Sequence, residues 1–561
     1  MTMTTAISPH PEPGRRPESK GRAATKVADA VARTLHSYGV RFAFGIPGND
    51  VLETIRACEE AGVTFVLAKS EPAAAFMADA VYQVTGAPAV LIPALGPGLA
   101  NAVSGIAGAL MERSAMIVLA GEMGAAHRGI YTHQVFDHVA LATPVTKWAA
   151  QLNPARAAQQ TAKALDIALA HPAGPVLLNL PADATRAESP ELALPRPAQV
   201  LGDGGLSEAA EAAARGMLAK AQRPVALVGL GTLIGQAPVA VREFVASWQL
   251  PVLASYKAKG VVDEHEVLAL GAVGLSPVVD AETIALLNEA DLLVLIGFDP
   301  IELRDAWVDA WSLRLPVLTI DWSAAPHRVF PLGRQAVGDM PAILHQLRRG
   351  KEPPAAWPAE RLAEYAGRVA TIVRRRRPPH GISPAALFAA VSEQATSDWL
   401  MTVDVGAHRI LANHVIKCRE PGQLIQSNGL CCMGYAVPAA LGAQLVYPER
   451  PVVALVGDGC MLISQGELAI AAERDLPIVV VVLNDGALSL IKLKQAKMQM
   501  APRAVDFGAP RFNVIGQGFG AATHRVETIA DFAAALREAV ASRRFTVIDA
   551  VIDPAEYMEQ M

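Results

Sequence analysis

Residues 451–490, PVVALVGDGCMLISQGELAIAAERDLPIVVVVLNDGALSL, decide the fold. The stretch starts with an apolar, β-branched run typical of a buried strand, and a second such run, IVVVVL, follows Pro477. Between the two runs, Ile463 to Arg474 carry apolar residues at helical spacing. The stretch therefore predicts a strand, a helix and a second strand, with the two strands parallel and adjacent.

Each of the two predicted strands ends at an acidic residue. Asp458 lies in the predicted turn Gly457-Asp458-Gly459, and Asp485 follows the second strand. The carboxyl ends of neighbouring parallel strands meet at one sheet edge, where open α/β sheets bind ligands. Two carboxylates there suit a Mg²⁺ ion that holds a diphosphate, because Mg²⁺ takes part of its oxygen shell from phosphate and water. A Rossmann-like unit with incidental acids at its turns is the alternative that spacing alone leaves open.

Length and composition limit the classes of protein. A chain of 561 residues is long enough for about three domains. A hydrophobic content of 52% with 18% charged residues indicates a folded protein, and a net charge of −5 argues against a nucleic-acid partner. The five cysteines form no CxxC pair and are odd in number, which suits a reducing cytoplasm without a disulfide framework.

Neither of two unusual stretches predicts a membrane segment. Residues 1–22 are rich in proline and arginine and lack the apolar segment of a signal peptide, so we expect a disordered tail. Residues 80–111 carry no charge, but prolines and glycines divide them into strand, turn and helix.

The remaining chain alternates strands and helices, which predicts an α/β fold of three doubly wound parallel-sheet domains. We expect the domains at residues 23–186, 205–350 and 380–561, with linkers at 185–206 and 350–382. Arg374–Arg377 lie in the second linker, where a solvated run is the favoured interpretation and contact with a polyanion the alternative.

Glu71 has two possible roles. It follows Ser70, a candidate N-cap, and precedes Pro72 at the start of an alanine-rich helix. One role is a first-turn acid that complements the helix dipole, worth less than about 1 kcal/mol. The other role depends on a family resemblance.

Several motifs of the chain resemble those of thiamine-diphosphate enzymes, in the family's order. GDG followed by an acid at the end of an apolar strand resembles their diphosphate-binding signature. The family usually has Asn at the position of Asp485, and an acid at this position resembles the catabolic acetolactate synthases. SEPAAAFMADA (70–80) resembles the segment that carries the catalytic glutamate. GPGLAN (96–101) resembles the turn beside the pyrimidine ring of the cofactor. SNGLCCMG (427–434) resembles the loop whose large apolar side chain lies between the two rings of the cofactor. HQVFD (133–137) with PVTKW (144–148) resembles a further run of the catabolic enzymes.

The resemblance implies a role for each matched residue. Glu71 hydrogen-bonds the N1′ atom of the cofactor, and Gln134 contacts the substrate or an intermediate. Asp458 and Asp485 bind the metal through side chains, and Ala487 through its carbonyl. Met433 forces the bent conformation of the cofactor. The full set of implied cofactor-binding residues is Gly48, Gly96, Asn101, Gly406, Met433, Gly457, Asp458, Gly459, Asp485, Ala487, Leu488 and Leu490. The implied substrate pocket consists of His133, Leu490, Ile491 and Lys494, although His133 could equally cap a loop. The chain differs from catabolic acetolactate synthases from Leu488 to Lys494.

The central domain resembles the flavin-free branch. Gly229–Gly235 form GxGxxxG, one residue away from the dinucleotide fingerprint, and no acid ends the next strand, so a structural turn is expected. DLLVLIGFDPIELR (291–304) resembles a run of the flavin-independent enzymes. The resemblance therefore implies thiamine diphosphate and Mg²⁺ without FAD, and leaves an adenine nucleotide open.

The implied activity is decarboxylation of a pyruvate-like 2-oxo acid with carboligation, as in acetolactate synthase. A 2-oxo acid decarboxylase or 2-hydroxyacyl-CoA lyase is one alternative, and a non-catalytic assembly subunit is another. The resemblance also implies a cytoplasmic homodimer at minimum, and a homotetramer by analogy. Cys431-Cys432 replaces the family's usual pair, and we expect two buried thiols there.

Overall fold

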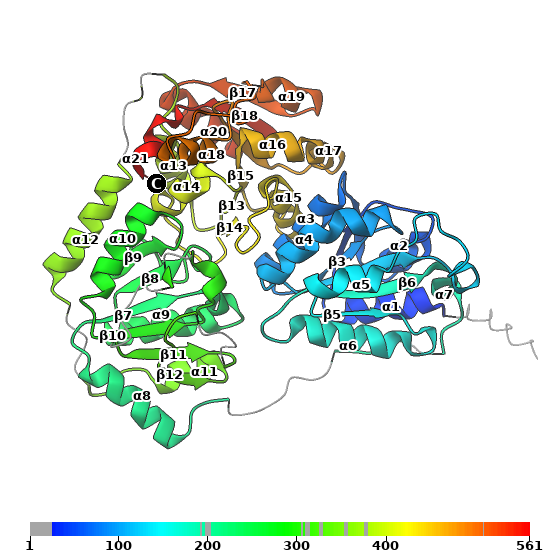
Figure 1. Ribbon diagram of the computed structural model, residues 1–561, viewed down its shortest axis with the longest axis horizontal. Coiled ribbons are helices and arrows are strands. Elements are labelled where there is room, and N and C mark those ends of the chain that lie inside the picture. Colours follow the sequence, from blue (N-terminus) through cyan, green and yellow to red (C-terminus); the bar gives the residue numbers. More distant parts are fainter. Residues whose placement is uncertain are drawn as a thin grey trace, which may run out of the picture.

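The computed structural model describes residues 25–560 except 191–192, 197–203, 305–306, 309–314, 325–328, 353–356, 375–377, 379 and 509. The expected tail, residues 1–22, and Arg375–Arg377 of the arginine run lie outside the described residues. The chain forms three lobes, and each lobe contains one six-stranded parallel sheet (Figure 1). The predicted α/β fold class is therefore confirmed.

The first sheet has the order β2-β1-β3-β4-β6-β5. Its strands are β1 (Phe42–Gly45), β2 (Thr64–Leu67), β3 (Ala89–Ile92), β4 (Met116–Glu122), β5 (Trp148–Gln151) and β6 (Val176–Pro181). Its helices are α1 (Val27–Ser37), α2 (Leu52–Glu60), α3 (Glu71–Thr85), α4 (Pro97–Met111), α5 (His138–Ala142), α6 (Ala157–Leu169) and α7 (Ala182–Arg186).

The central sheet has a different order, β12-β11-β10-β7-β8-β9. Its strands are β7 (Pro224–Val228), β8 (Val252–Ser255), β9 (Ala269–Val273), β10 (Leu292–Ile296), β11 (Val317–Asp321) and β12 (Arg334–Val337). The helices are α8 (Glu208–Lys220), α9 (Ala237–Trp248), α10 (Pro277–Leu287) and α11 (Met340–Gln346), and α12 (Ala359–Ile372) leads to the last domain. This strand order is that of the dinucleotide-binding fold, with its switch point between β7 and β10.

The third sheet repeats the topology of the first, in the order β14-β13-β15-β16-β18-β17. Its strands are β13 (Leu400–Val403), β14 (Leu424–Gln426), β15 (Val452–Gly457), β16 (Val479–Asn484), β17 (Ala522–Val526) and β18 (Thr546–Val551). The helices are α13 (Pro384–Gln394), α14 (Ala407–Val415), α15 (Ala436–Val446), α16 (Asp458–Ser464), α17 (Leu468–Glu473), α18 (Ser489–Lys497), α19 (Phe512–Gly518), α20 (Ile529–Ser542) and α21 (Tyr557–Gln560).

The predicted strand–helix–strand unit is confirmed, with one correction. β15 and β16 are parallel neighbours in register from Val453 opposite Val479 to Gly457 opposite Leu483. The helix, however, begins at Asp458 and not at Ile463, so Gly457-Asp458-Gly459 is a junction of strand and helix. The helix is interrupted at residues 465–467 by a short 3-10 turn. The backbone N–H groups of the first helical turn therefore lie at the sheet edge itself.

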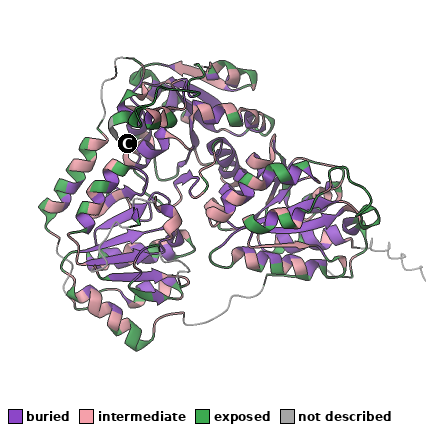
Figure 2. Ribbon diagram, in the orientation of Figure 1, coloured by how far each residue is buried: buried purple, intermediate pink, exposed green. Residues whose placement is uncertain are grey.

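The first and last domains share one apolar core. Helices α3 and α15 pack against each other, and their side chains belong to the same buried cluster (Figures 1 and 2). Polar contacts add to this packing: the Tyr435 hydroxyl donates to Asp79 at 2.6 Å, and Glu467 accepts from the Lys69 backbone and the Ser70 hydroxyl, both at 3.0 Å. Ser70 is the N-cap of α3 by position, but its hydroxyl makes no capping bond.

Residues 80–111 form the end of α3, strand β3 and helix α4, as the prolines and glycines predict. In the described part of the chain, every helix is too short or too polar to span a lipid bilayer.

Candidate functional site

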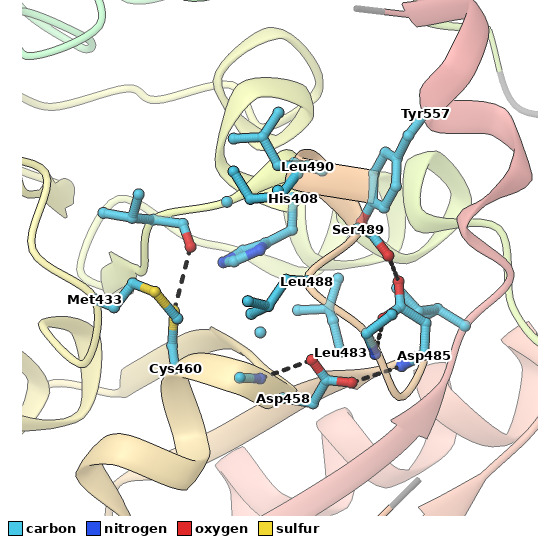
Figure 3. Close-up of a pocket in the computed structure, with 18 residues that line it drawn as sticks. His408, Met433, Asp458, Cys460, Leu483, Asp485, Leu488, Ser489, Leu490 and Tyr557 are labelled. Atoms are coloured by element: carbon cyan, nitrogen blue, oxygen red, sulfur yellow. Dashed lines mark hydrogen bonds between the residues drawn. The ribbon is translucent and has the colours of Figure 1, made fainter. Parts of the chain in front are cut away.

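A cavity of about 160 Å³ opens at the carboxyl edge of the third sheet, beyond the ends of β13, β15 and β16 (Figure 3). All of its lining residues come from the last domain: Val405, Gly406, Ala407, His408, Met433, Gly457, Asp458, Gly459, Cys460, Leu483, Asp485, Ala487, Leu488, Ser489, Leu490, Ile491, Ile552 and Tyr557. Ten of these residues belong to the predicted site, and the other eight were not predicted.

Asp458 lies at the floor of this cavity, held by backbone N–H groups (Figure 3). One carboxylate oxygen accepts from the backbone of Asp485 at 3.0 Å and of Gly486 at 2.6 Å, and the other accepts from Gly459 at 2.7 Å. These bonds tie the end of β15 to the loop after β16. The predicted convergence of the two acids at one sheet edge is therefore present.

Asp485 is held by its own loop. The Ser489 hydroxyl donates to its carboxylate at 2.6 Å, and the backbone of Ala487 donates at 3.2 Å. Burial raises the pKa of Asp458 to about 7, and the neighbouring Asp485 carboxylate adds to the rise. Burial also raises the pKa of Asp485. A cation bound beside both carboxylates would offset the cost of ionising them.

The donor set fits a hard divalent cation. Two carboxylates and the nearby carbonyl of Ala487 are oxygen ligands of the type that Mg²⁺ selects, and they are too few to complete six-fold coordination. Among the described residues, no cluster of three or more His, Cys, Asp or Glu side chains could hold a metal by itself. A metal at this edge would therefore share its ligands with a bound molecule, such as a diphosphate.

His408 is a cavity residue that sequence reasoning missed. It follows Gly406, whose φ of +148° favours glycine, in the first turn of α14. The side chain is only 6% exposed, its Nε2 has no hydrogen-bond partner, and burial lowers its pKa to about 3, with the Arg409 charge adding to the effect. A Cβ at Gly457 would lie 2.9 Å from the His408 ring. The backbone N–H groups of the first turn of α14, beside this neutral imidazole, suit a bound phosphate oxygen.

Met433 and Leu488 supply the apolar part of the cavity. Met433 is 37% exposed and projects into the open space, as expected for a residue that packs against a bound ring. Leu488 precedes α18, and a Cβ at Gly459 would lie 2.7 Å from its Cδ2. Gly459 is therefore needed so that both side chains fit above the start of α16.

The predicted residues of the first domain gather separately from this cavity. Glu71 starts α3, is partly buried, and accepts from the Asn101 side chain at 3.3 Å. Gly98 lies beside the same carboxylate, and Gly96 lies against Gln134, whose φ is +60°. The GPGLAN turn thus brings together the residues that the resemblance assigned to the pyrimidine.

Three predicted residues lie elsewhere. Gly48 packs against Ala94 and Asp50, on the approach to the GPGLAN turn. The ring of His133 is directed toward Tyr131, with 6.2 Å between the centroids. Lys494 is exposed on α18 and does not line the cavity, whereas Leu490 and Ile491 on the same helix do.

The glycine-rich turn of the central domain is filled by the chain itself. The carboxylate of Glu302 accepts from the backbone N–H of Leu230 at 2.9 Å and also from Ser255. Burial raises the pKa of Glu302 to about 8. A Cβ at Gly229 would lie 2.5 Å from this carboxylate. In dinucleotide-binding domains, this turn and the following helix bind a pyrophosphate.

The loop before Met433 is held by all three domains. Lys257 of the central domain donates to Glu112 of the first domain and to the carbonyl of Gln426, both at 2.8 Å. Glu112 in turn accepts from the backbone N–H of Asn428, whose side chain accepts from Tyr256. The position of Met433 therefore depends on contacts that cross both domain boundaries.

Comparison with known families agrees with this architecture. Residues 25–141 match the N-terminal TPP-binding domain of thiamine pyrophosphate enzymes, residues 211–347 the central domain, and residues 404–550 the C-terminal TPP-binding domain. The chain belongs to the thiamine pyrophosphate enzyme family.

Its relatives include several acetolactate synthases. The acetolactate synthase of Bacillus subtilis is 29% identical over 96% of this chain and 95% of its own length. The acetolactate synthase large subunit of Parasynechococcus marenigrum is 30% identical over 88% of this chain and 82% of its own length. The catabolic acetolactate synthase of Raoultella terrigena is 28% identical over 91% of this chain and 92% of its own length. These similarities extend through all three domains.

Proposed function

We propose that the protein uses thiamine diphosphate and Mg²⁺ to decarboxylate a pyruvate-like 2-oxo acid and to join the product to a second carbonyl compound, as an acetolactate synthase does. The observation that carries the proposal is the convergence of Asp458 and Asp485 at the cavity floor, with backbone donors and His408 around them. The motif order and the acetolactate synthase relatives support it.

The residues divide the work between them. Asp458 and Asp485 hold the metal, and His408 with the first turn of α14 binds the diphosphate. Met433 orients the cofactor rings, and Glu71 holds a proton toward the pyrimidine. When bound, thiamine diphosphate supplies an electron sink for the bond that breaks as CO₂ leaves. Leu488, Leu490 and Ile491 exclude water around the substrate.

The proposal includes independence from FAD. It is supported by Glu302, because its carboxylate already occupies the backbone donors at the switch point of the central sheet. A pyrophosphate would have to displace this buried carboxyl group.

The proposal also includes a homodimer, in which the cavity and the Glu71 cluster would form the two halves of one site. The cavity lining comes entirely from the last domain, whereas Glu71, Asn101 and Gln134 belong to the first. A second copy of the chain would supply the missing half to each cavity, and a tetramer would pair two such dimers.

The test is to incubate the purified protein with pyruvate, thiamine diphosphate and Mg²⁺ and to measure acetolactate and acetaldehyde separately. We expect acetolactate as the main product, and its loss in Asp458→Asn. Acetaldehyde alone would indicate a decarboxylase. Absence of both products, with cofactor binding intact, would contradict the pyruvate-like substrate while leaving the cofactor site standing.

A further inference from the structure

The loop before Met433 contains two cysteines in unusual surroundings. Cys431 adopts a φ of +54°, which is uncommon for a residue other than glycine. Both Cys431 and Cys432 are partly exposed, which corrects the expectation of two buried thiols. The cause is that the chain leaves the buried segment Gln426–Asn428 at Gly429 and Leu430 and stays partly exposed through Met433.

Arg409 lies directly against Cys431. It is 2% exposed, and its guanidinium donates to the Cys431 sulfur at 3.3 Å and to the carbonyl of Ser427. Its Nε–H has no hydrogen-bond partner in the described part of the chain. The Cys431 thiol donates to the carbonyl of Asn428 at 2.7 Å. The sulfur is thus fixed between a carbonyl and a buried cation.

This cation lacks a carboxylate counterpart. None of the ion pairs among the described residues includes Arg409, and Glu112 is already paired with Lys257 at 2.8 Å. The guanidinium is held by the Ser427 carbonyl and lies over the Tyr256 ring, 5.7 Å from its centroid, and neither group carries a negative charge. This site therefore favours any change that places negative charge beside the guanidinium. The sulfur of Cys431 is the group in position to carry that charge.

We propose that Cys431 is a site of covalent modification by hydrogen peroxide and by soft electrophiles, with Arg409 stabilising the negative charge that develops on the sulfur. In the oxidation, the sulfur attacks one peroxide oxygen and the O–O bond breaks. The departing hydroxide takes the thiol proton and leaves as water. The sulfur becomes a sulfenic acid, and the peroxide oxygens are reduced.

The other cysteines lack this arrangement. Cys58, Cys418 and Cys460 are buried, and burial raises the pKa of Cys58 and Cys418 to about 12. Burial also raises the pKa of Cys432 to about 11, and its sulfur points to the carbonyl of Ser104 at 3.9 Å. The chain therefore contains four internal controls for the selectivity of Cys431.

Modification would also disturb the cofactor, a consequence that rests on the proposed function. Cys431 lies two residues before Met433, and an added oxygen would push the loop away from Arg409 or Asn428. We expect bound thiamine diphosphate with Mg²⁺ to slow the modification, and prior modification to weaken cofactor binding.

The experiment treats the full chain with hydrogen peroxide and a sulfenic-acid trap such as dimedone, and quantifies adducts by peptide mass spectrometry. We expect Cys431 to be trapped at least about tenfold faster than any other cysteine. Alkylation by iodoacetamide, in which the sulfur displaces iodide, should also be fastest at Cys431. Equal labelling, or faster labelling of Cys432, would overturn the proposal.

Variants separate the role of Arg409 from simple exposure. Cys432→Ser should leave the Cys431 rate unchanged, whereas Arg409→Met should lower it about tenfold or more. An unchanged rate in a folded Arg409→Met protein would remove the guanidinium from the explanation. If that variant does not fold, the site selectivity of the natural chain still decides. Because trapping needs no turnover, its failure is distinguishable from failure of the proposed enzyme activity.

Discussion

Asp458 and Asp485 are fixed by backbone hydrogen bonds at the carboxyl edge of the third sheet. The donors are backbone N–H groups at the start of α16 and in the loop after β16, so the fold itself positions both carboxyl groups. Burial and mutual repulsion raise the pKa of Asp458 to about 7. Ionisation of Asp458 in the folded protein therefore carries an electrostatic penalty, which a bound cation would reduce.

This penalty predicts a dependence of stability on pH. Because the folded protein raises the Asp458 pKa, the contribution of this carboxyl to stability is present below about pH 4 and is lost as pH rises toward 7. We expect the Tm of the metal-free protein to fall less across this window in Asp458→Asn than in the natural chain. Calorimetry at several pH values tests this, and parallel curves for the two proteins would contradict it.

Glu71→Gln separates catalysis from binding. The amide keeps the shape of the side chain and the contact with Asn101 but cannot hold the proton. We expect kcat to fall by about 10² or more while the affinity for thiamine diphosphate changes little. Steady-state kinetics with fluorescence titration of the cofactor checks both values. Unchanged turnover would show that Glu71 is only a helix-capping acid.

At the scale of elements, the sequence predicts best where the pattern is long and local. Strands β15 and β16 and the acids after them follow from two β-branched runs, and the GPGLAN turn follows from its glycines. His408 and Tyr557 were missed because their place in the cavity depends on where α14 and α21 pack. Lys494 was misplaced because a helix position reveals its face only when the neighbours are known. The start of α16 at Asp458 was missed because GDG is also a turn signal.

The contact between α3 and α4 allows a matched pair of glycine substitutions. A Cβ at Gly105 would overlap Ala75 of α3, whereas a Cβ at Gly108, also buried on α4, has Phe76 at 3.9 Å as its nearest neighbour. We expect Gly105→Ala to destabilise the fold by about 1–3 kcal/mol. Gly108→Ala should be neutral or slightly stabilising, because alanine favours a helix. Urea unfolding measures the stability of both variants. Similar losses of unfolding free energy in the two would contradict the close contact of Gly105 with Ala75.

At the scale of the whole molecule, the central domain helps to hold the loop before Met433 in position. The Lys257–Glu112 ion pair is buried and joins the central and first domains, while both residues also hold the segment Gln426–Asn428. This arrangement gives the central domain a role in the site that needs no nucleotide.

Breaking this pair should destabilise the whole chain. Lys257→Met removes the cation that pairs with the buried Glu112 carboxylate, which costs about 3–5 kcal/mol. Adding Glu112→Gln should restore part of the loss. The exposed pair Lys492–Asp506 is the control, because Lys492→Met should change stability by less than about 1 kcal/mol. Calorimetry of the natural protein and the three variants gives the order of their stabilities. An equal loss of stability in Lys257→Met and Lys492→Met would contradict a stabilising role of the Lys257–Glu112 pair.

The measurement that tests the central claim most directly mixes two inactive variants, Glu71→Gln and Asp458→Asn, after joint unfolding and refolding. If each site takes Glu71 from one chain and Asp458 from the other, half of the dimers are mixed and each keeps one intact site. Activity should then return to about a quarter of the natural level. Mixtures no more active than the separate variants, despite formation of mixed dimers, would contradict a site shared between chains.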